Sequence, residues 1–347
     1  MESVPIKNND DNTSKPYTSI KREIYNLTNE PLDNVVNAPS YENIGGSQDI
    51  NELLKTGVIN LNKPMGPTSH QVSSWVKLIF DVAKLGHGGT LDPRVTGVLP
   101  LAFEASTKLL HVLNYSTKEY VGVMRLHSDQ LLKKIKCVSE EFVGPIYQTP
   151  PLRSAVKRQL RIRTIYSLDI LEQQGRDVLF KVECEGGTYI RSLVHDIGLV
   201  LGSGAHMQEL RRVRTGPFHE RDSVTLHELK DAVVAYHDEN EPEQLLKLIK
   251  PRETILLDLP RVIIQDSAVD AVCHGAPLAL PGILQFDDLR RKGESAAIFT
   301  RKGEAVALGE VVMRTNEILS STSGIALKTS RVLMPLGTYK KGWKTKN

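Results

Sequence analysis

GHGGTLDPRVTG, residues 86–97, places a single carboxylate, Asp92, in a glycine-rich loop. Gly88 and Gly89 allow the backbone to adopt positive φ and to approach a large ligand closely. Pro93 favours an extended conformation at Asp92. A rigid loop is a common place for catalytic groups, whereas Asp-Pro beside glycines is also an ordinary turn signal. These residues alone favour a simple turn, with a catalytic loop as the alternative.

The composition is that of an ordinary globular protein. The chain has 347 residues, 40% of them hydrophobic and 24% charged, which is enough for two or three domains. It has no run of about 20 apolar residues and no apolar N-terminal segment, so neither a membrane span nor a secretory signal is expected. The three cysteines are scattered, without disulfide or zinc spacing, and favour a reducing compartment.

The distribution of positive charge says more than its total, since the formal net charge is only +3. One run between residues 148 and 167 contains no acidic residue, a second lies near residue 212, and a third lies at the C-terminus. Such clusters bind phosphates, and a solvated face is the alternative for any single one. The clustered residues are Arg153, Lys157, Arg158, Arg161 and Arg163; Arg211, Arg212 and Arg214; and Lys340, Lys341, Lys344 and Lys346.

Apolar periodicity predicts helices and strands in irregular order. After a polar extension, residues 57–61 form a short apolar strand, and Thr68 with Gln71 has capping-box spacing for a helix that Gly86 is expected to end. Strands are expected at 120–126 and 178–185, and another helix near Tyr189. The mixture favours an α+β fold. Short apolar runs separated by Gly and Pro after residue 251 indicate a β-barrel of about 80 residues.

The changes in composition and apolar pattern along the chain predict four segments: an N-terminal extension (1–50), a catalytic domain (51–255), a small β-domain (256–339) and a basic tail (340–347).

Arg191 stands in the first turn of its predicted helix, within GGTYIR (186–191). A cation there opposes the helix macrodipole, so a carboxylate partner such as Asp92 is one interpretation and an ordinary surface arginine is the other. Tyr120 and Tyr189 are candidates to stack on a nucleobase, against core packing with a satisfied hydroxyl. His87 is a weak candidate for acid or base chemistry, and a structural role or a phosphate contact is favoured for it.

Other chemistries find no support in the sequence. Residues 86–90 lack the order of a P-loop, and no dinucleotide fingerprint, nucleophile elbow or zinc-protease motif is present. A lone carboxylate, an arginine, aromatics and basic clusters suit a reaction on RNA that needs no cofactor and no metal.

At this point the motifs resemble those of the TruB-type pseudouridine synthases. The matching segments are GVINLNKPMGPTS (57–69), GHGGTLDPRVTGVLP (86–100), KEY (118–120), GTYIR (187–191) and LRR (210–212). Three further segments resemble the archaeal dyskerin-like branch, the catalytic subunit of box H/ACA guide-RNA particles: residues 147–166, 204–218 and 266–282. The resemblance covers roughly residues 50 to 340 in order.

This resemblance implies a mixed, mainly antiparallel sheet core with helices, followed by a C-terminal PUA domain. It implies that Asp92 starts cleavage of the uridine C1′–N1 bond, by attacking the sugar or by removing a sugar proton, and that the freed uracil rejoins through C5. Arg191 would pair with the aspartate and Tyr120 would stack on the flipped base. Leu210 would form an apolar wall beside Tyr189, and His87 would lie near the flipped nucleotide.

The resemblance also implies RNA contacts and partners. Residues 150–163 match a mobile segment that closes over RNA, and the PUA domain holds the ACA end of the guide. The implied RNA-binding residues are Lys63, Arg153, Lys157, Arg158, Gly275, Pro281 and Gly282. The implied partners are the guide RNA, an rRNA or tRNA substrate, and Nop-type, Gar-type and kink-turn-binding proteins. The extension would pack on the PUA domain. The short C-terminus favours an archaeal cytoplasmic protein over a nucleolar one.

Three hypotheses for the function follow. The first is a guide-dependent pseudouridine synthase, the second is a stand-alone tRNA pseudouridine synthase of the same chemistry, and the third is a non-catalytic RNA-binding scaffold. Asp92, Tyr120 and Arg191 are all present, which places the scaffold last. The sequence does not name the target uridines, because guide pairing would select them.

Overall fold

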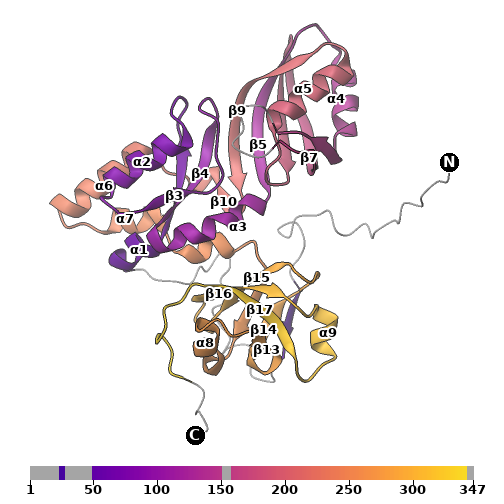
Figure 1. Cartoon of the computed structure of the whole chain (residues 1–347). Coiled ribbons are helices and arrows are strands. Elements are labelled where there is room, and N and C mark those ends of the chain that lie inside the picture. Colours follow the sequence, from indigo (N-terminus) through magenta and orange to yellow (C-terminus); the bar gives the residue numbers. More distant parts are fainter. Residues whose placement is uncertain (1–22, 28–48, 151–157, 342–347) are drawn as a thin grey trace, which may run out of the picture. The chain divides into compact units, whose positions relative to one another are not determined.

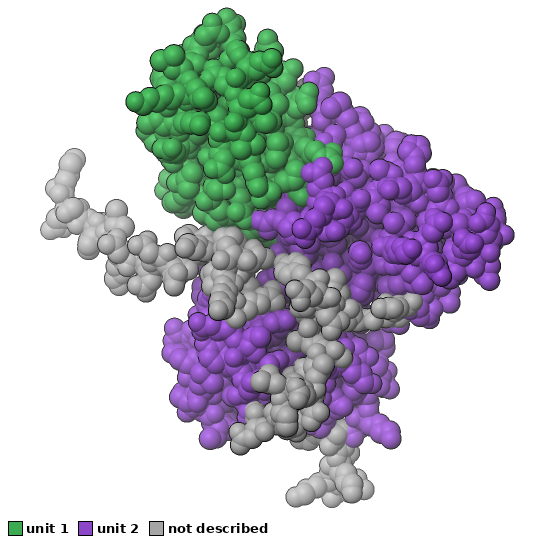
Figure 2. Space-filling model, turned by 180° about the vertical axis from the view of Figure 1, so that it is seen from behind, with its two compact units in different colours: residues 1–20, 115–213 green, residues 21–114, 214–347 purple. Residues whose placement is uncertain are grey.

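The computed structural model describes residues 23–27, 49–150 and 158–341. Two residues predicted to bind RNA, Arg153 and Lys157, therefore lie outside the described residues. So do most of the N-terminal extension and most of the basic tail. The chain forms two compact units, shown in Figure 2. One comprises residues 115–213 and the other comprises residues 21–114 with 214–347.

In the described part of the 115–213 unit, an antiparallel sheet is accompanied by the two helices α4 and α5. Its strands follow the order β9-β5-β8-β7-β6, and α4 contacts both β7 and α5 (Figure 1). Buried residues alternate along β8, which confirms the predicted strand there. The elements are β5 (Lys118–Leu126), α4 (Leu132–Glu141), β6 (Gly144–Gln148), β7 (Arg161–Gln174), β8 (Asp177–Cys184), α5 (Ile190–Leu201) and β9 (Ala205–Thr215, whose last two residues belong to the other unit).

The second unit begins with paired strands and helices. Strand β2 lies between β11 and β4, and β3 pairs with β4 antiparallel. The elements are α1 (Ile50–Thr56), β2 (Val58–Lys63), α2 (Ser69–Ile79), β3 (Leu85–His87), β4 (Thr96–Phe103), η3 (Glu104–Leu109), α3 (Leu110–Tyr115), β10 (Phe218–His219), η4 (Glu220–Asp222), α6 (Leu226–Asp238), α7 (Glu243–Leu248), β11 (Ile249–Lys250) and η5 (Arg252–Leu256).

Helix α2 begins as predicted and ends earlier than predicted. Thr68 and Gln71 form the complete capping box. The expectation that Gly86 ends this helix is wrong, because α2 ends at Ile79 and Asp81 takes a left-handed conformation with φ of 49°. Gly86 instead lies in β3, where a Cβ would come within 2.9 Å of Leu110.

The C-terminal half of this unit is a seven-stranded sheet in the order β1-β14-β12-β15-β16-β17-β13. Its first strand comes from the N-terminal extension: β1 pairs antiparallel with β14, and Tyr25 stacks on Phe286. The elements are β1 (Ile24–Asn26), β12 (Arg261–Ile264), α8 (Asp266–Cys273), β13 (Leu278–Ala279), η6 (Leu280–Gly282), β14 (Ile283–Asp287), β15 (Ser295–Phe299), β16 (Ala305–Val311), α9 (Thr315–Leu319) and β17 (Ile325–Val332).

The two halves of this unit share one hydrophobic core. Val98 and Leu109 from the first half pack in the same cluster as Ile263, Phe299 and Leu333 from the second. Polar contacts also join the two halves along this seam. Arg252 donates to the Leu333 carbonyl, and the Glu253 carboxylate accepts from the Ala305 N–H. Lys108 donates to the Val332 carbonyl. Burial raises the pKa of Glu253 above its ordinary value, and Arg252 opposes that shift. The two halves therefore form a single packed body.

Candidate functional site

Asp92 lies at the tip of a turn between β3 and β4. The Val95 N–H donates to the Asp92 carbonyl at 3.0 Å and closes the turn over Pro93 and Arg94. Leu91 and Val95 on either side are only 4% and 3% exposed, whereas Asp92 itself is exposed. The turn thus presents one carboxylate outward while both of its flanks are packed.

The glycines before Asp92 serve two different purposes. Gly89 has φ of 86°, the left-handed conformation expected for it. Gly88 is buried, and a Cβ there would lie 2.6 Å from Leu113 Cδ1, so this position needs glycine for close packing.

Lys63, predicted to bind RNA, is buried beside the Asp92 turn and bonds to its backbone, and a contact from Lys63 to RNA stays a prediction. Its side chain is fully buried, and its ammonium donates to the carbonyls of Pro64 at 2.9 Å, Pro93 at 3.1 Å and Val95 at 3.0 Å. An ammonium has three protons to donate, so all three are used inside the protein. Burial lowers the pKa of Lys63, and the Asp92 carboxylate opposes that shift. Lys63 is the last residue of β2, where the strand pairs with Gly97 of β4.

Two further groups that the sequence did not single out hold the same turn. The Ser69 hydroxyl accepts from Leu91 N–H at 2.8 Å and donates to the Leu91 carbonyl at 3.1 Å. Gly66 N–H donates to the Pro93 carbonyl at 2.9 Å. The available signal was weak: Ser69 follows the N-cap of α2 directly, and Gly66 lies in a Pro-Met-Gly-Pro run.

His87 has hydrogen-bond partners within its own unit. Its Nδ1 lies 3.1 Å from the Ser73 hydroxyl and its Nε2 lies 3.5 Å from the Thr90 hydroxyl. The half-buried ring therefore ties α2 to the loop before Asp92. A contact from His87 to a nucleotide stays a prediction.

The other predicted site residues belong to the 115–213 unit. Tyr120, on β5, is 8% exposed, and Arg212, on β9, donates a hydrogen bond to its phenol oxygen. Arg212 is only 2% exposed, which excludes it from the phosphate-binding cluster assigned by charge. Burial lowers the pKa of Arg212, and Tyr120 opposes that shift. Leu210 packs near the same strand, since a Cβ on Gly122 would lie 2.9 Å from Leu210 Cδ1.

Tyr189 and Arg191 stand at the start of α5, as predicted. Tyr189 is the N-cap and has no side-chain cap bond; instead the buried Gln148 amide accepts from Tyr189 N–H at 2.9 Å and donates to its carbonyl at 3.1 Å. Arg191 is exposed in the first turn. Gln148 was missed because an amide in a strand pattern carries no distinctive sequence signal. Since Asp92 and Arg191 belong to different units, their pairing stays a prediction.

The remaining predicted RNA-binding residues are accessible to different degrees. Arg158 is exposed beside the segment outside the described residues. Gly275, exposed with φ of 86°, follows α8. Pro281 is exposed and Gly282 half-buried, and their carbonyls accept from the Gln265 side chain and backbone. Their contacts with RNA stay predictions.

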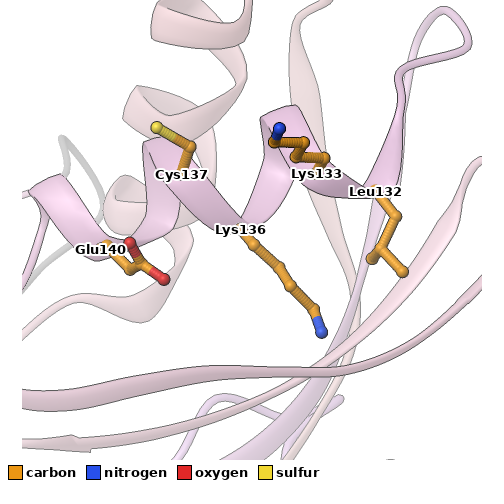
Figure 3. Close-up of a pocket in the computed structure, with 5 residues that line it drawn as sticks. All are labelled: Leu132, Lys133, Lys136, Cys137 and Glu140. Atoms are coloured by element: carbon orange, nitrogen blue, oxygen red, sulfur yellow. The ribbon is translucent and has the colours of Figure 1, made fainter.

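A shallow pocket on the exposed face of α4 is unrelated to these groups. It is lined by Leu132, Lys133, Lys136, Cys137 and Glu140, all from that helix (Figure 3). It includes none of the predicted site residues. Within residues 23–27, 49–150 and 158–341, no three His, Cys, Asp or Glu side chains are grouped as a metal ion would need. No helix in that part of the chain is long and apolar enough to span a membrane.

Comparison with known protein families accounts for most of the chain. The N-terminal domain of TruB family pseudouridylate synthases matches residues 77–190, and the C-terminal domain of tRNA pseudouridylate synthase B matches residues 191–257. The PUA domain matches residues 260–333, and the DKCLD domain matches residues 45–73.

Relatives match over nearly their whole length. A protein of Methanosarcina barkeri is 51% identical over 89% of this chain and 91% of its own length. A protein of Methanopyrus kandleri is 55% identical over 85% of this chain and 87% of its own. Both carry the name "Probable tRNA pseudouridine synthase B".

Two solved structures are similar throughout. A chain in an H/ACA RNP bound to a substrate RNA containing 2′-deoxyuridine is 45% identical, with a TM-score of 0.84 over 94% of this chain and 99% of that one. A chain in a Cbf5-Nop10-Gar1 complex is 48% identical, also with a TM-score of 0.84, over 93% of this chain and 97% of that one.

Proposed function

Since the chain belongs to the TruB family of pseudouridine synthases and is an RNA pseudouridine synthase, we propose that Asp92 is its catalytic carboxylate and that a box H/ACA guide RNA selects the uridine. The catalytic role of Asp92 is supported by the turn at residues 91–95. Lys63 and Ser69 hold its backbone on the two sides of Asp92, and the Asp92 side chain is exposed. Catalytic groups need this kind of support to reach a productive geometry.

The proposed reaction is an isomerisation in which atoms balance without a second substrate. Asp92 starts cleavage of the C1′–N1 bond by attack on the sugar or by removal of a sugar proton. The uracil then turns and C5 bonds to C1′. The bond between Asp92 and the sugar breaks in the first case, and the removed sugar proton returns in the second. The C5 proton leaves to solvent while N1 gains a proton. The uridine must first leave its stack, which costs a few kcal/mol.

The remaining roles follow the family resemblance residue by residue. Arg191 keeps the Asp92 carboxylate ionised and oriented, and Tyr120 stacks on the flipped base and assists the late proton transfer. Support for Tyr120 comes from Arg212, which fixes its phenol oxygen from the neighbouring strand. Leu210 and Tyr189 line the pocket, and His87 is an auxiliary. Arg153, Lys157, Arg158, Gly275, Pro281 and Gly282 contact RNA.

The proposed partners rest on the similar structures. One of these contains a substrate RNA within an H/ACA particle and another contains Nop10 and Gar1. We extend this to a guide RNA, an rRNA or tRNA substrate, Nop-type and Gar-type proteins, and a kink-turn-binding protein that the guide brings in. The cytoplasm of an archaeal cell is the proposed location.

A second candidate function is guide-independent modification of tRNA, which the names of the relatives favour. The chemistry and the site residues would be the same. The two candidate functions differ only in whether a guide RNA or the tRNA itself presents the uridine to the site, so one assay separates them.

That assay is tritium release from RNA labelled at uridine C5, with and without a guide RNA and accessory proteins. Asp92→Asn should abolish release while RNA affinity stays within about twofold, because the change is nearly isosteric. Asp81→Asn is the matched control, as it removes an exposed carboxylate from the same unit. Guide-dependent release that Asp92→Asn eliminates supports the proposal. Release from bare tRNA alone supports the second candidate, and appreciable release by Asp92→Asn removes Asp92 from its role.

A further inference from the structure

The hydroxyl of Ser69 forms a two-way hydrogen bond with the residue before Asp92. It accepts from the Leu91 N–H at 2.8 Å and donates to the Leu91 carbonyl at 3.1 Å. Ser69 is 1% exposed and Leu91 is 4% exposed, so water does not replace these bonds. One hydroxyl can act as donor and acceptor together. Ser69 thus satisfies both main-chain groups of Leu91, as a neighbouring strand would.

The support under Ser69 is rigid. Ser69 is the first residue of α2, which the capping box of Thr68 and Gln71 holds at its start. The Ser69 carbonyl also accepts from the Ser73 hydroxyl one turn later. A group mounted on a capped helix end is placed more precisely than one on a loop.

The two sides of Asp92 are held by different elements. On the C-terminal side, Gly66 N–H and the Lys63 ammonium both bond to the Pro93 carbonyl. On the N-terminal side, the Ser69 hydroxyl holds the peptide groups of Leu91, which is bonded directly to Asp92. Removing the Ser69 hydroxyl would release that side of Asp92 while the other side stays anchored.

We propose that Ser69 is a positioning residue for the pseudouridine synthase reaction, setting the backbone of Leu91 so that the Asp92 carboxylate meets the sugar at the correct distance. This rests on the proposed catalytic role of Asp92. Ser69 touches neither substrate nor the reacting atoms. Its effect is on geometry, so it acts on the chemical step and leaves RNA binding unchanged.

The test uses the full chain assembled with guide RNA and accessory proteins. Ser69→Ala should lower the single-turnover rate about 10- to 100-fold, the loss that follows a displacement near 1 Å at a reacting group. RNA affinity should stay within about twofold. Ser69→Thr keeps the hydroxyl and should recover most of the rate even if its extra methyl lowers the melting temperature. Hydrogen exchange at the Leu91 amide should accelerate in Ser69→Ala and not in Ser69→Thr.

Ser106→Ala is the matched control. Ser106 lies in the same unit, is also 1% exposed, and its hydroxyl also donates to a backbone carbonyl, that of Thr56. It should lower stability to a similar extent and leave the rate unchanged. Should Ser69→Ala fail to fold, Ser69→Cys replaces it, since a thiol keeps the shape but bonds weakly, and its rate should fall between those of wild type and Asp92→Asn.

Two outcomes separate this inference from the proposed function. An Asp92→Asn protein with wild-type rate overturns the catalytic assignment and the inference with it. An inactive Asp92→Asn beside a Ser69→Ala with wild-type rate overturns the positioning role alone. Equal rate losses in Ser69→Ala and Ser106→Ala, or no recovery in Ser69→Thr, also overturn it, since they indicate a general loss of stability.

Discussion

Replacing Lys63 by methionine tests whether this lysine supports the Asp92 turn or contacts RNA. Methionine has nearly the length of the lysine stem and fills the same buried space without its charge. The substitution removes three hydrogen bonds to the carbonyls of Pro64, Pro93 and Val95. Of these acceptors, Pro93 keeps the Gly66 N–H as a partner.

The expected loss of stability follows from these contacts. A hydrogen bond from a charged donor contributes about 1.5–3 kcal/mol, so three bonds give a gross loss of about 4.5–9 kcal/mol. The gain from no longer burying an ammonium offsets several kcal/mol of this, and the lowered pKa of Lys63 reflects that burial. A net loss of about 2–4 kcal/mol remains, which corresponds to a melting temperature lower by about 5–10 °C.

Two measurements, thermal unfolding and the salt dependence of guide-RNA binding, show together whether Lys63 supports the turn or contacts RNA. Each phosphate contact contributes about 0.7–0.9 to the slope of log affinity against log salt. Lys63→Met should therefore leave the slope unchanged while lowering the melting temperature and the rate. The control is Lys77→Met, because Lys77 is an exposed lysine of α2, and this variant should have the wild-type melting temperature. A wild-type melting temperature with a slope reduced by nearly one unit would refute this reasoning and restore Lys63 as an RNA contact.

Three further predictions concern other parts of the molecule. At pH 8, a thiol reagent should modify Cys137 rapidly and Cys184 only after unfolding, because Cys137 is exposed while burial raises the pKa of Cys184 to about 12; rapid labelling of Cys184 in the folded protein, located by mass spectrometry, would contradict this. Burial also raises the pKa of Glu253 above its ordinary 4.5. The unfolded chain therefore ionises this carboxyl more readily than the folded protein does, and wild-type stability falls as the pH rises from 4.5 towards 7. The melting temperature of Glu253→Gln relative to wild type should increase over this range, and a decrease would show that pairing with Arg252 dominates. Gln148→Ala should speed hydrogen exchange at the Tyr189 amide and lower the rate about tenfold, and unchanged exchange would rule out the brace at the start of α5.

Local patterns in the sequence predicted the elements whose causes are local. The capping box at Thr68 and Gln71 and the alternation along β8 need only neighbouring residues, and both are confirmed. The end of α2 was misplaced because Asp81, not a glycine, adopts the left-handed conformation after the helix.

Tertiary packing buries two charged residues, Lys63 and Arg212, that the sequence predicted to bind RNA or phosphate. Lys63 and Arg212 look like solvent-facing cations in sequence. The Lys63 ammonium donates to the carbonyls of Pro93 and Val95, which lie in the Asp92 turn, and the Arg212 side chain bonds to the phenol of Tyr120 on another strand. No window of sequence contains both members of such a pair, so burial of this kind could not be predicted. The family resemblance identified the motif that contains Lys63, and its hydrogen bonds to the Asp92 turn emerged only from the structure.

The core shared by the two halves of the 21–114 and 214–347 unit affects how mutant phenotypes should be interpreted. Phe299 lies in the segment that matches the PUA domain, yet it packs in one cluster with Val98, on the strand that follows the Asp92 turn. A genetic screen that sorts alleles by segment would class a Phe299 lesion as an RNA-recognition defect. Its first effect would be on the packing beneath β4, the strand that follows the Asp92 turn. Pleiotropy is therefore the expected behaviour of alleles along this seam, and second-site suppressors should arise in the opposite half.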